Sequence, residues 1–174
     1  MPNFPYQDEL ENALETHQRI LLRTDKQSYF EDCLEVLFFL TNTEKRNALV
    51  ISFDTNNENL IHKFLEKGGD IKKLQIIDGA NIDSLEEIDV SVNSFLTKIY
   101  PPNTVVVFIS LHAILTKTPD EIAIFLERIL ERIDRTGAFT VMIMHTSSDF
   151  ALLQIVSSKS KKIVPIRKEL LIKG

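Results

Sequence analysis

Short apolar runs alternate along this chain with longer amphipathic stretches, and this alternation constrains the fold more than any other feature. The runs at 104–109 and 138–144 are apolar on both faces, as strands are when helices cover both sides of a parallel sheet. Further strands are expected at 19–24, 47–53, 74–77, 162–166 and 169–172. Strands separated by helices form a mainly parallel sheet, so we expect a three-layer α/β fold with helices on both faces.

Helical spacing of apolar residues marks the segments between these strands. The best-marked helix begins after Thr118, because Thr118 can cap it, Pro119 suits its first position and Gly137 can close it. Further helices are expected at 29–41, 57–67, 84–100 and 148–156. The last two strands are close enough in sequence to form a C-terminal hairpin, which would place Pro165 on an edge or at a bulge.

Length and composition are those of a single globular domain covering residues 1–174. Of its residues, 44% are hydrophobic and 26% are charged, which is ordinary for a soluble protein. The single cysteine excludes an internal disulfide. Neither a signal peptide nor an apolar run of roughly 20 residues is present, so we expect a cytoplasmic protein with no membrane span. The net charge of −5 argues against binding to nucleic acid, which depends on a basic surface.

The two ends of the chain carry opposite charge. Residues 1–18, expected to form an acidic helix or extension, hold four acids and no Lys or Arg, whereas residues 159–174 hold six basic residues and one acid. These ends are either solvated or attract each other within or between subunits. The helix at 29–41 has almost no polar face in its second half. It is therefore either covered within the monomer or exposes an interface.

The first strand-to-helix turn stands where a phosphate-binding loop would stand, but it lacks the residues of such a loop. A phosphate loop follows the pattern G-x-x-x-x-G-K-[ST], because glycines let backbone N–H groups close around the phosphates. The turn in this chain consists of Thr24, Asp25, Lys26, Gln27 and Ser28, and it contains no glycine. The arrangement of elements favours a nucleotide fold, whereas the residues of the turn argue against nucleotide hydrolysis.

The same turn is expected to satisfy its own helix. Ser28 and Glu31 have the spacing of a capping box, which would occupy the first N–H groups of the helix. Asp25, Glu31 and Asp32 surround the positive end of the helix dipole, where they would repel an anion. Lys26 is a lone cation that could still touch a phosphate. We therefore expect a self-capped structural turn.

Polar side chains follow the expected strands, at the edge of a parallel sheet where ligands bind. They are Thr24, Asp25, Asp54, Asp78, Ser110, His112 and His145. No two of them share a metal-type spacing, and no Ser-His-Asp or Cys-His order is present, so we predict neither a metal site nor a catalytic residue. An enzyme of different chemistry on a Rossmann-like sheet, using His112, His145 and the aspartates, remains an alternative.

Several stretches follow the pattern of a known family. They are 52–74, 74–80, 105–115 and 170–174. Within the first, Gly68-Gly69-Asp70-Ile71 matches a Gly-x-Asp-Leu-like turn, and 105–115 is similar to a Walker B strand with its Ser-Leu continuation. Over residues 19–174 the chain resembles the RecA-like ATPase domains of the circadian-clock protein KaiC and its archaeal relatives. The resemblance implies a RecA-like fold and an ancestral ATP site.

The positions at which this chain differs from the family are those that bind and hydrolyse ATP. The family's phosphate loop is replaced by residues 24–28, and its paired glutamates, which activate the attacking water, correspond to Asp54 and Thr55. The Walker B aspartate corresponds to Ile109, just before Ser110. An isoleucine cannot ligate hydrated Mg²⁺, which requires oxygen ligands. Phosphoryl transfer needs a backbone cradle for the phosphates, a lysine, a metal ion and a group that positions the attacking water. Hydrolysis by this chain is therefore not expected.

The leading hypothesis is therefore a degenerate RecA/KaiC-like domain, a pseudo-ATPase that acts in regulation or signalling by binding a protein partner and holds no cofactor. The alternative is a domain that still binds ATP, ADP or another small ligand weakly at the strand ends. Because KaiC- and RecA-like domains pack side by side, the resemblance also implies a homo-oligomer.

Overall fold

A parallel sheet forms the centre of the protein, with the strand order β3-β2-β4-β5-β1-β6 among the described residues. The computed structural model describes residues 7–16, 19–54, 56–81, 85–98, 103–111, 118–145 and 150–165. The strands are β1 (Arg19–Thr24), β2 (Asn47–Ser52), β3 (Leu74–Asp78), β4 (Thr104–Ile109), β5 (Phe139–His145) and β6 (Lys162–Pro165). All pairings between these strands are parallel. The expected α/β fold with a parallel sheet is confirmed.

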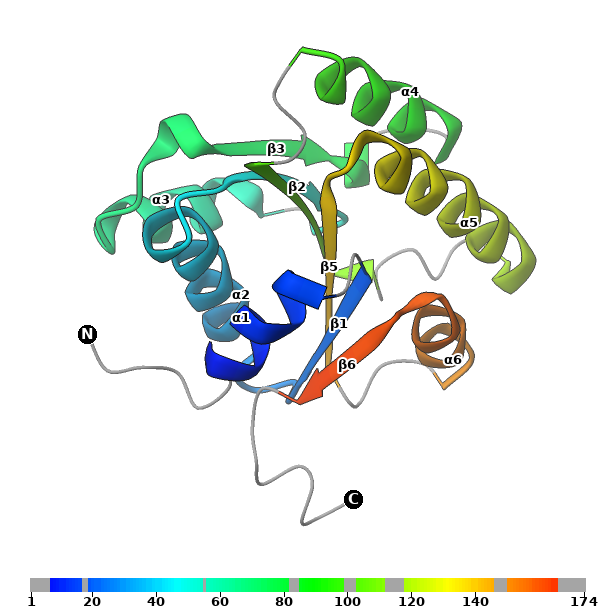
Figure 1. The fold of residues 1–174 in the computed structure, drawn as a ribbon, viewed down its shortest axis with the longest axis horizontal. Helices are drawn as coiled ribbons and strands as arrows, with labels where there is room; N and C mark the ends of the chain where they lie inside the picture. Colours follow the sequence, from blue (N-terminus) through cyan, green and yellow to red (C-terminus); the bar gives the residue numbers. More distant parts are fainter. Residues whose placement is uncertain are drawn as a thin grey trace.

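Helices cover both faces of this sheet. They are α1 (Gln7–Thr16), α2 (Tyr29–Phe38), α3 (Asn57–Glu66), α4 (Leu85–Leu96), α5 (Pro119–Thr136) and α6 (Phe150–Lys159). Figure 1 shows α1, α2 and α3 on one side of the sheet and α4, α5 and α6 on the other. Successive side chains of a strand point to opposite faces of the sheet. In β4, Val105 and Val107 belong to the core under α1–α3, whereas Val106 and Phe108 belong to the core under α4–α6. The predicted three layers are confirmed.

The connections explain which helix lies on which face. From β1 the chain passes through α2 to β2 and through α3 to β3, moving in one direction across the sheet. It then returns through α4, α5 and α6 on the opposite face, because crossovers of one hand must change face when their direction reverses. The connections from β1 and β2 therefore leave one face, and those from β4 and β5 leave the other. Such a switch at the carboxyl edge is where ligands bind in open parallel sheets.

The apolar second half of α2 is covered within the chain. Its buried side chains include Val36 and Leu37, and they continue into the short π-helix η1 (Phe39–Thr43). Leu14 of α1 and Phe64 of α3 belong to the same core. Of the two outcomes expected for this segment, coverage within the monomer is therefore the observed one, and the segment offers no exposed interface.

The ends of α5 follow the expected chemistry. The Thr118 hydroxyl accepts the Glu121 N–H at 3.2 Å, Pro119 opens the helix, and Gly137 ends it with a left-handed φ of 86°. Residues 169–172, the expected second strand of a terminal hairpin, lie outside the described residues. Within the described residues, β6 pairs with β1 at the end of the sheet, and no helix is long and apolar enough to cross a membrane.

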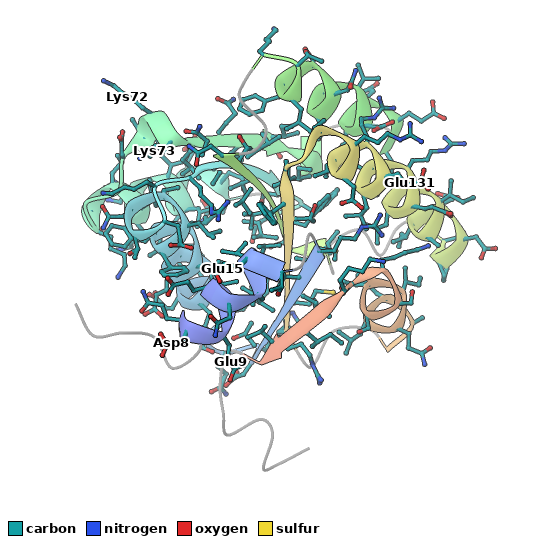
Figure 2. All side chains as sticks on the ribbon, viewed as in Figure 1. Asp8, Glu9, Glu15, Lys72, Lys73 and Glu131 are labelled. Carbon is teal, nitrogen blue, oxygen red and sulfur yellow. The ribbon has the colours of Figure 1, made fainter. Side chains whose placement is uncertain are left out.

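The acidic N-terminal segment is the helix α1 over its described residues. Its acids, Asp8, Glu9, Glu11 and Glu15, are all exposed. Figure 2 shows Asp8, Glu9 and Glu15 projecting from α1, well apart from the lysine pair Lys72 and Lys73 beside β3. The surface of the molecule thus carries a defined acidic region on α1.

Candidate functional site

Tyr29 ties together the carboxyl ends of two strands at the position of the expected nucleotide site. Its hydroxyl donates to the Ile143 carbonyl at 2.6 Å and accepts the Ser110 N–H at 2.7 Å. The His145 ring packs edge-on against the Tyr29 ring, with centroids 5.2 Å apart. Tyr29 is the first residue of α2, so one side chain joins this helix to β4 and β5. Sequence reasoning missed this role.

Burial sets the protonation state of this tyrosine. It raises the pKa of the Tyr29 phenol well above its ordinary value, because the charged form would lose its hydration. The hydroxyl therefore stays protonated, as its donation to Ile143 requires. Burial likewise raises the pKa of the Cys33 thiol, which lies one turn further along α2. A thiol in this state is a packing group and not a nucleophile, as its apolar surroundings also indicate.

The first turn is held by a buried carboxylate and not by a capping box. Asp32 is 1% exposed, and one of its oxygens accepts both the Ser28 hydroxyl, at 2.8 Å, and the Thr24 hydroxyl. The Ser28 side chain caps no helix N–H, so the predicted capping box of Ser28 and Glu31 is wrong. The physical reason is orientation. The Ser28 side chain is turned to the Asp32 carboxylate, with which a hydroxyl forms a stronger hydrogen bond than it does with a neutral acceptor, and in that position it accepts no helix N–H.

The rest of the turn offers little to an anion. The Asp25 carboxylate accepts the Gln27 N–H at 2.7 Å, so this backbone donor is already used. Lys26 and Gln27 are exposed. A phosphate cradle needs several converging N–H groups, whereas here two carboxylates, from Asp25 and Asp32, lie at the start of α2.

The end of β2 forms a second local network beside Tyr29. The Ser52 hydroxyl donates to the Asn57 carboxamide oxygen at 2.6 Å and accepts the Asp54 N–H at 3.2 Å. The exposed Asp54 carboxylate accepts the Asn56 N–H at 2.9 Å, and Ser110 Oγ lies 3.5 Å from its other oxygen. These bonds hold the turn after β2 closed. Thr55, the other residue expected to replace a catalytic glutamate, lies outside the described residues.

A small cavity remains where these groups meet. Its volume is about 50 Å³, and Tyr29, Asp54, Ile109 and Ser110 are among the residues that line it. Ile109 is 4% exposed and presents no oxygen ligand to this space. Pockets that bind small molecules have volumes of roughly 300–1,000 Å³. The cavity can hold water, but its size does not suit a nucleotide.

The other predicted polar residues do not converge here. Asp78, at the end of the edge strand β3, accepts the N–H of Ala80 in its own turn at 3.2 Å. His145 is buried against Tyr29, and His112 lies outside the described residues. Among the residues that the structure describes, no group of three His, Cys, Asp or Glu side chains could hold a metal ion.

Comparison with known proteins identifies the fold. Neither the protein-family models nor the curated proteins give a match to this sequence. Among the solved structures that match is a KaiC-like protein from the hyperthermophilic archaeon Pyrococcus horikoshii, with a TM-score of 0.66. It is 11% identical, and the alignment covers 86% of this chain and 72% of that chain. The chain thus has a KaiC-like, RecA-type fold, as its sequence resemblance predicts.

Proposed function

We propose that this protein is a non-catalytic RecA/KaiC-like domain that acts by binding a protein partner in regulation or signalling. One observation carries the proposal. The Tyr29 hydroxyl bonds both Ser110 and Ile143 at the point where a nucleotide of this fold would sit, and the space beside it is about 50 Å³. Ile109 in place of a metal-binding acid and the carboxylates at the start of α2 support the same conclusion.

The groove between α4 and α5 is the surface we propose for the partner. It has a volume of about 380 Å³, and its apolar lining consists of Leu85, Phe125 and Ile124, of which Ile124 is 52% exposed. Three carboxylates, Glu86, Asp89 and Glu121, and one guanidinium, Arg128, also line it. The Asp89 carboxylate is already bonded by Arg132 of α5, so Glu86 and Glu121 leave the groove a small acidic excess over Arg128. Charge complementarity therefore favours a segment that is both basic and apolar. Residues 166–174 of this chain, which follow β6 in the sequence, have that composition, with three basic residues, one acid and four aliphatic residues, so we propose a second copy as the occupant.

Mg-ATP is expected to leave the melting temperature unchanged within about 1 °C. A ligand at about 100 times its dissociation constant adds roughly 2.7 kcal/mol of stability to the folded state. For a chain of this length that corresponds to an upward shift of roughly 5–10 °C. The measurement is a thermal-shift titration with Mg-ATP and Mg-ADP. A shift of several degrees with either nucleotide would contradict the non-catalytic, nucleotide-free assignment.

Self-association is expected to depend on salt, because the proposed contact pairs an acidic groove with a basic segment. Light scattering after gel filtration would show a dimer or larger ring at low salt that weakens near about 0.5 M salt, where charges are strongly screened. Glu121→Lys, inside the groove, should weaken the association. Glu131→Lys makes the same charge change on an exposed position of α5 outside the groove and should not. A monomer at every concentration and at both salts rules out the second copy as partner.

A further inference from the structure

The guanidinium of Arg23 is partly buried without a hydrogen-bond partner on its Nε atom. Arg23 is the second-last residue of β1, between Met144 of β5 and Pro165 of β6 in the sheet register. Among the described residues, nothing accepts a hydrogen bond from its buried Nε. A buried donor of a charged group that lacks an acceptor costs free energy. Arg23 is therefore poised for an acceptor that is not among these side chains.

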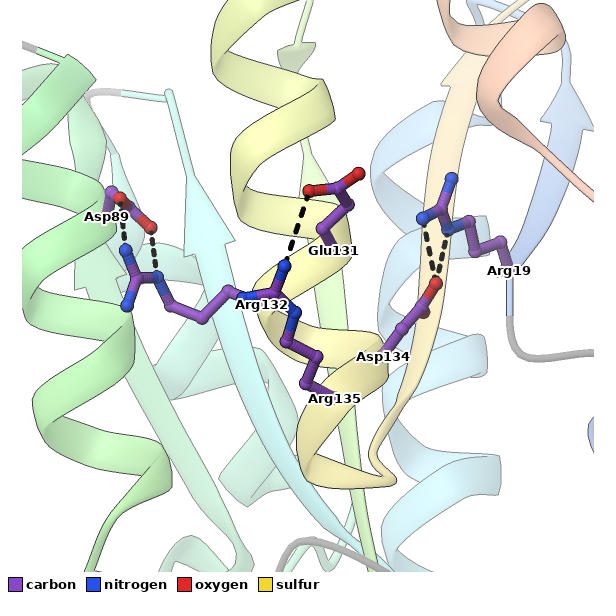
Figure 3. Close-up of polar contacts among 6 residues, drawn as sticks. All are labelled: Arg19, Asp89, Glu131, Arg132, Asp134 and Arg135. Atoms are coloured by element: carbon purple, nitrogen blue, oxygen red, sulfur yellow. Dashed lines mark hydrogen bonds and ion pairs between the residues drawn. The ribbon is translucent and has the colours of Figure 1, made fainter.

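Arg19 on the same strand shows how this chain can satisfy such a group. Four residues apart, Arg19 and Arg23 point to the same face of the sheet. Arg19 bonds the Asp134 carboxylate of α5 through Nε at 2.9 Å and through a terminal nitrogen at 2.7 Å, as Figure 3 shows. Its other terminal nitrogen reaches the Lys159 carbonyl at 3.4 Å. The chain thus provides a carboxylate for the first guanidinium and none for the second among the described residues.

An open cavity lies beside Arg23, between β1 and α6. Its volume is about 470 Å³, within the size range of small-molecule sites. Apart from Arg23, the described residues that line it are Leu153, Gln154, Ser157 and Ser158 of α6. None of these residues is acidic, so they leave the positive charge of Arg23 uncompensated. Amide and hydroxyl groups can add hydrogen bonds to a bound oxyanion, and Leu153 can contact an apolar part.

We infer that this cavity binds a small organic oxyanion, a phosphate ester or a carboxylate, through the guanidinium of Arg23. A guanidinium presents its N–H groups in a planar fork that matches the oxygens of both anions. The site is distinct from the first turn. Arg23 faces the α6 side of the sheet, whereas Tyr29 and Asp32 belong to α2 on the opposite side (Figure 1). The proposed function neither requires nor uses this site.

The test follows the Nε–H resonance of Arg23 in a two-dimensional ¹H–¹⁵N NMR titration, assigned by its loss in Arg23→Gln. Sodium phosphate and sodium acetate are the probes, and sodium chloride at matched ionic strength is the control. We expect a saturable shift with a dissociation constant of roughly 1–10 mM for at least one probe. The Nε–H of Arg135, whose side chain is 81% exposed, should not move. Saturation by phosphate alone identifies a phosphate ester, and saturation by acetate alone identifies a carboxylate.

Matched variants test the contact itself through the amide shifts of α6. Arg23→Lys keeps the charge but loses the planar fork, so binding should weaken about tenfold. Arg135→Gln makes the same charge change as Arg23→Gln at an exposed site and should leave the titration unchanged. An Arg23 resonance that moves linearly, or that moves equally with chloride, overturns the inference, as does full binding by folded Arg23→Gln. If Arg23→Gln does not fold, the loss of the resonance in Arg23→Lys gives the assignment, and the wild-type titration decides.

Discussion

Tyr29→Phe is expected to lower the free energy of unfolding by roughly 2–4 kcal/mol. The substitution keeps the ring and removes only the hydroxyl. The Ser110 N–H and the Ile143 carbonyl, which now bond this hydroxyl at 2.7 and 2.6 Å, would both lose their partner. Both residues are buried, and each unsatisfied buried group costs about 1–3 kcal/mol. Urea denaturation of the wild type and of Tyr29→Phe measures the difference. The two curves are compared with the same dependence of the unfolding free energy on urea concentration.

A hydroxyl deletion on the surface provides the control. The exposed Ser158 donates to the Ile155 carbonyl at 2.7 Å within α6. Because water can replace this donor, Ser158→Ala should change the free energy of unfolding by less than about 0.5 kcal/mol. Equal effects of Tyr29→Phe and Ser158→Ala would mean that the Tyr29 hydroxyl does not hold the ends of β4 and β5 together.

Asp32→Ala is expected to lower the free energy of unfolding by roughly 2–4 kcal/mol, because hydrogen bonds to a charged group contribute about 1.5–3 kcal/mol each. The substitution removes the shared acceptor of Thr24 and Ser28 in the first turn. Thr24 is fully buried, so its hydroxyl would lose its bond to Asp32 where water has little access. Thermal or urea unfolding provides the measurement.

The matched control lies in the same turn. Asp25→Ala also removes one carboxylate near the start of α2, but the bond it deletes, to the Gln27 N–H, is exposed to water. It should cost about 1 kcal/mol or less. If Asp32→Ala is no more destabilising than Asp25→Ala, the buried carboxylate does not hold the turn, and the turn stays open to a functional interpretation.

The layers of this fold are predictable from local pattern, because burial on two faces leaves unbroken apolar runs. The runs 104–109 and 139–145 are central strands, and Thr118 and Gly137 end their helix as expected. The strand order is not predictable in this way. The crossover from β1 to β2 passes over β5 and β4, and no local signal in the sequence encodes which strands a crossover skips.

The candidate site was only partly predictable, because local sequence signals do not encode contacts between distant segments. Thr24, Asp25 and Ser28 could be placed in one turn because they are neighbours in sequence. The partners of Tyr29 are 81 and 114 residues away along the chain, so only the folded structure brings them together. The capping pattern at Ser28 was misleading, because Asp32 one turn later is a stronger partner for its hydroxyl.

The central claim, that the first turn does not accept a nucleotide, is tested most directly by an NMR titration with Mg-ATP. The backbone amides of residues 24–32 and of Ser110 are followed in the wild type and in Arg23→Gln, which excludes any contribution from the cavity beside α6. We predict that these amides do not move in either protein. Saturable shifts of Asp25, Lys26 and Gln27 in both proteins, lost in Lys26→Ala, would contradict the account and restore a working nucleotide site.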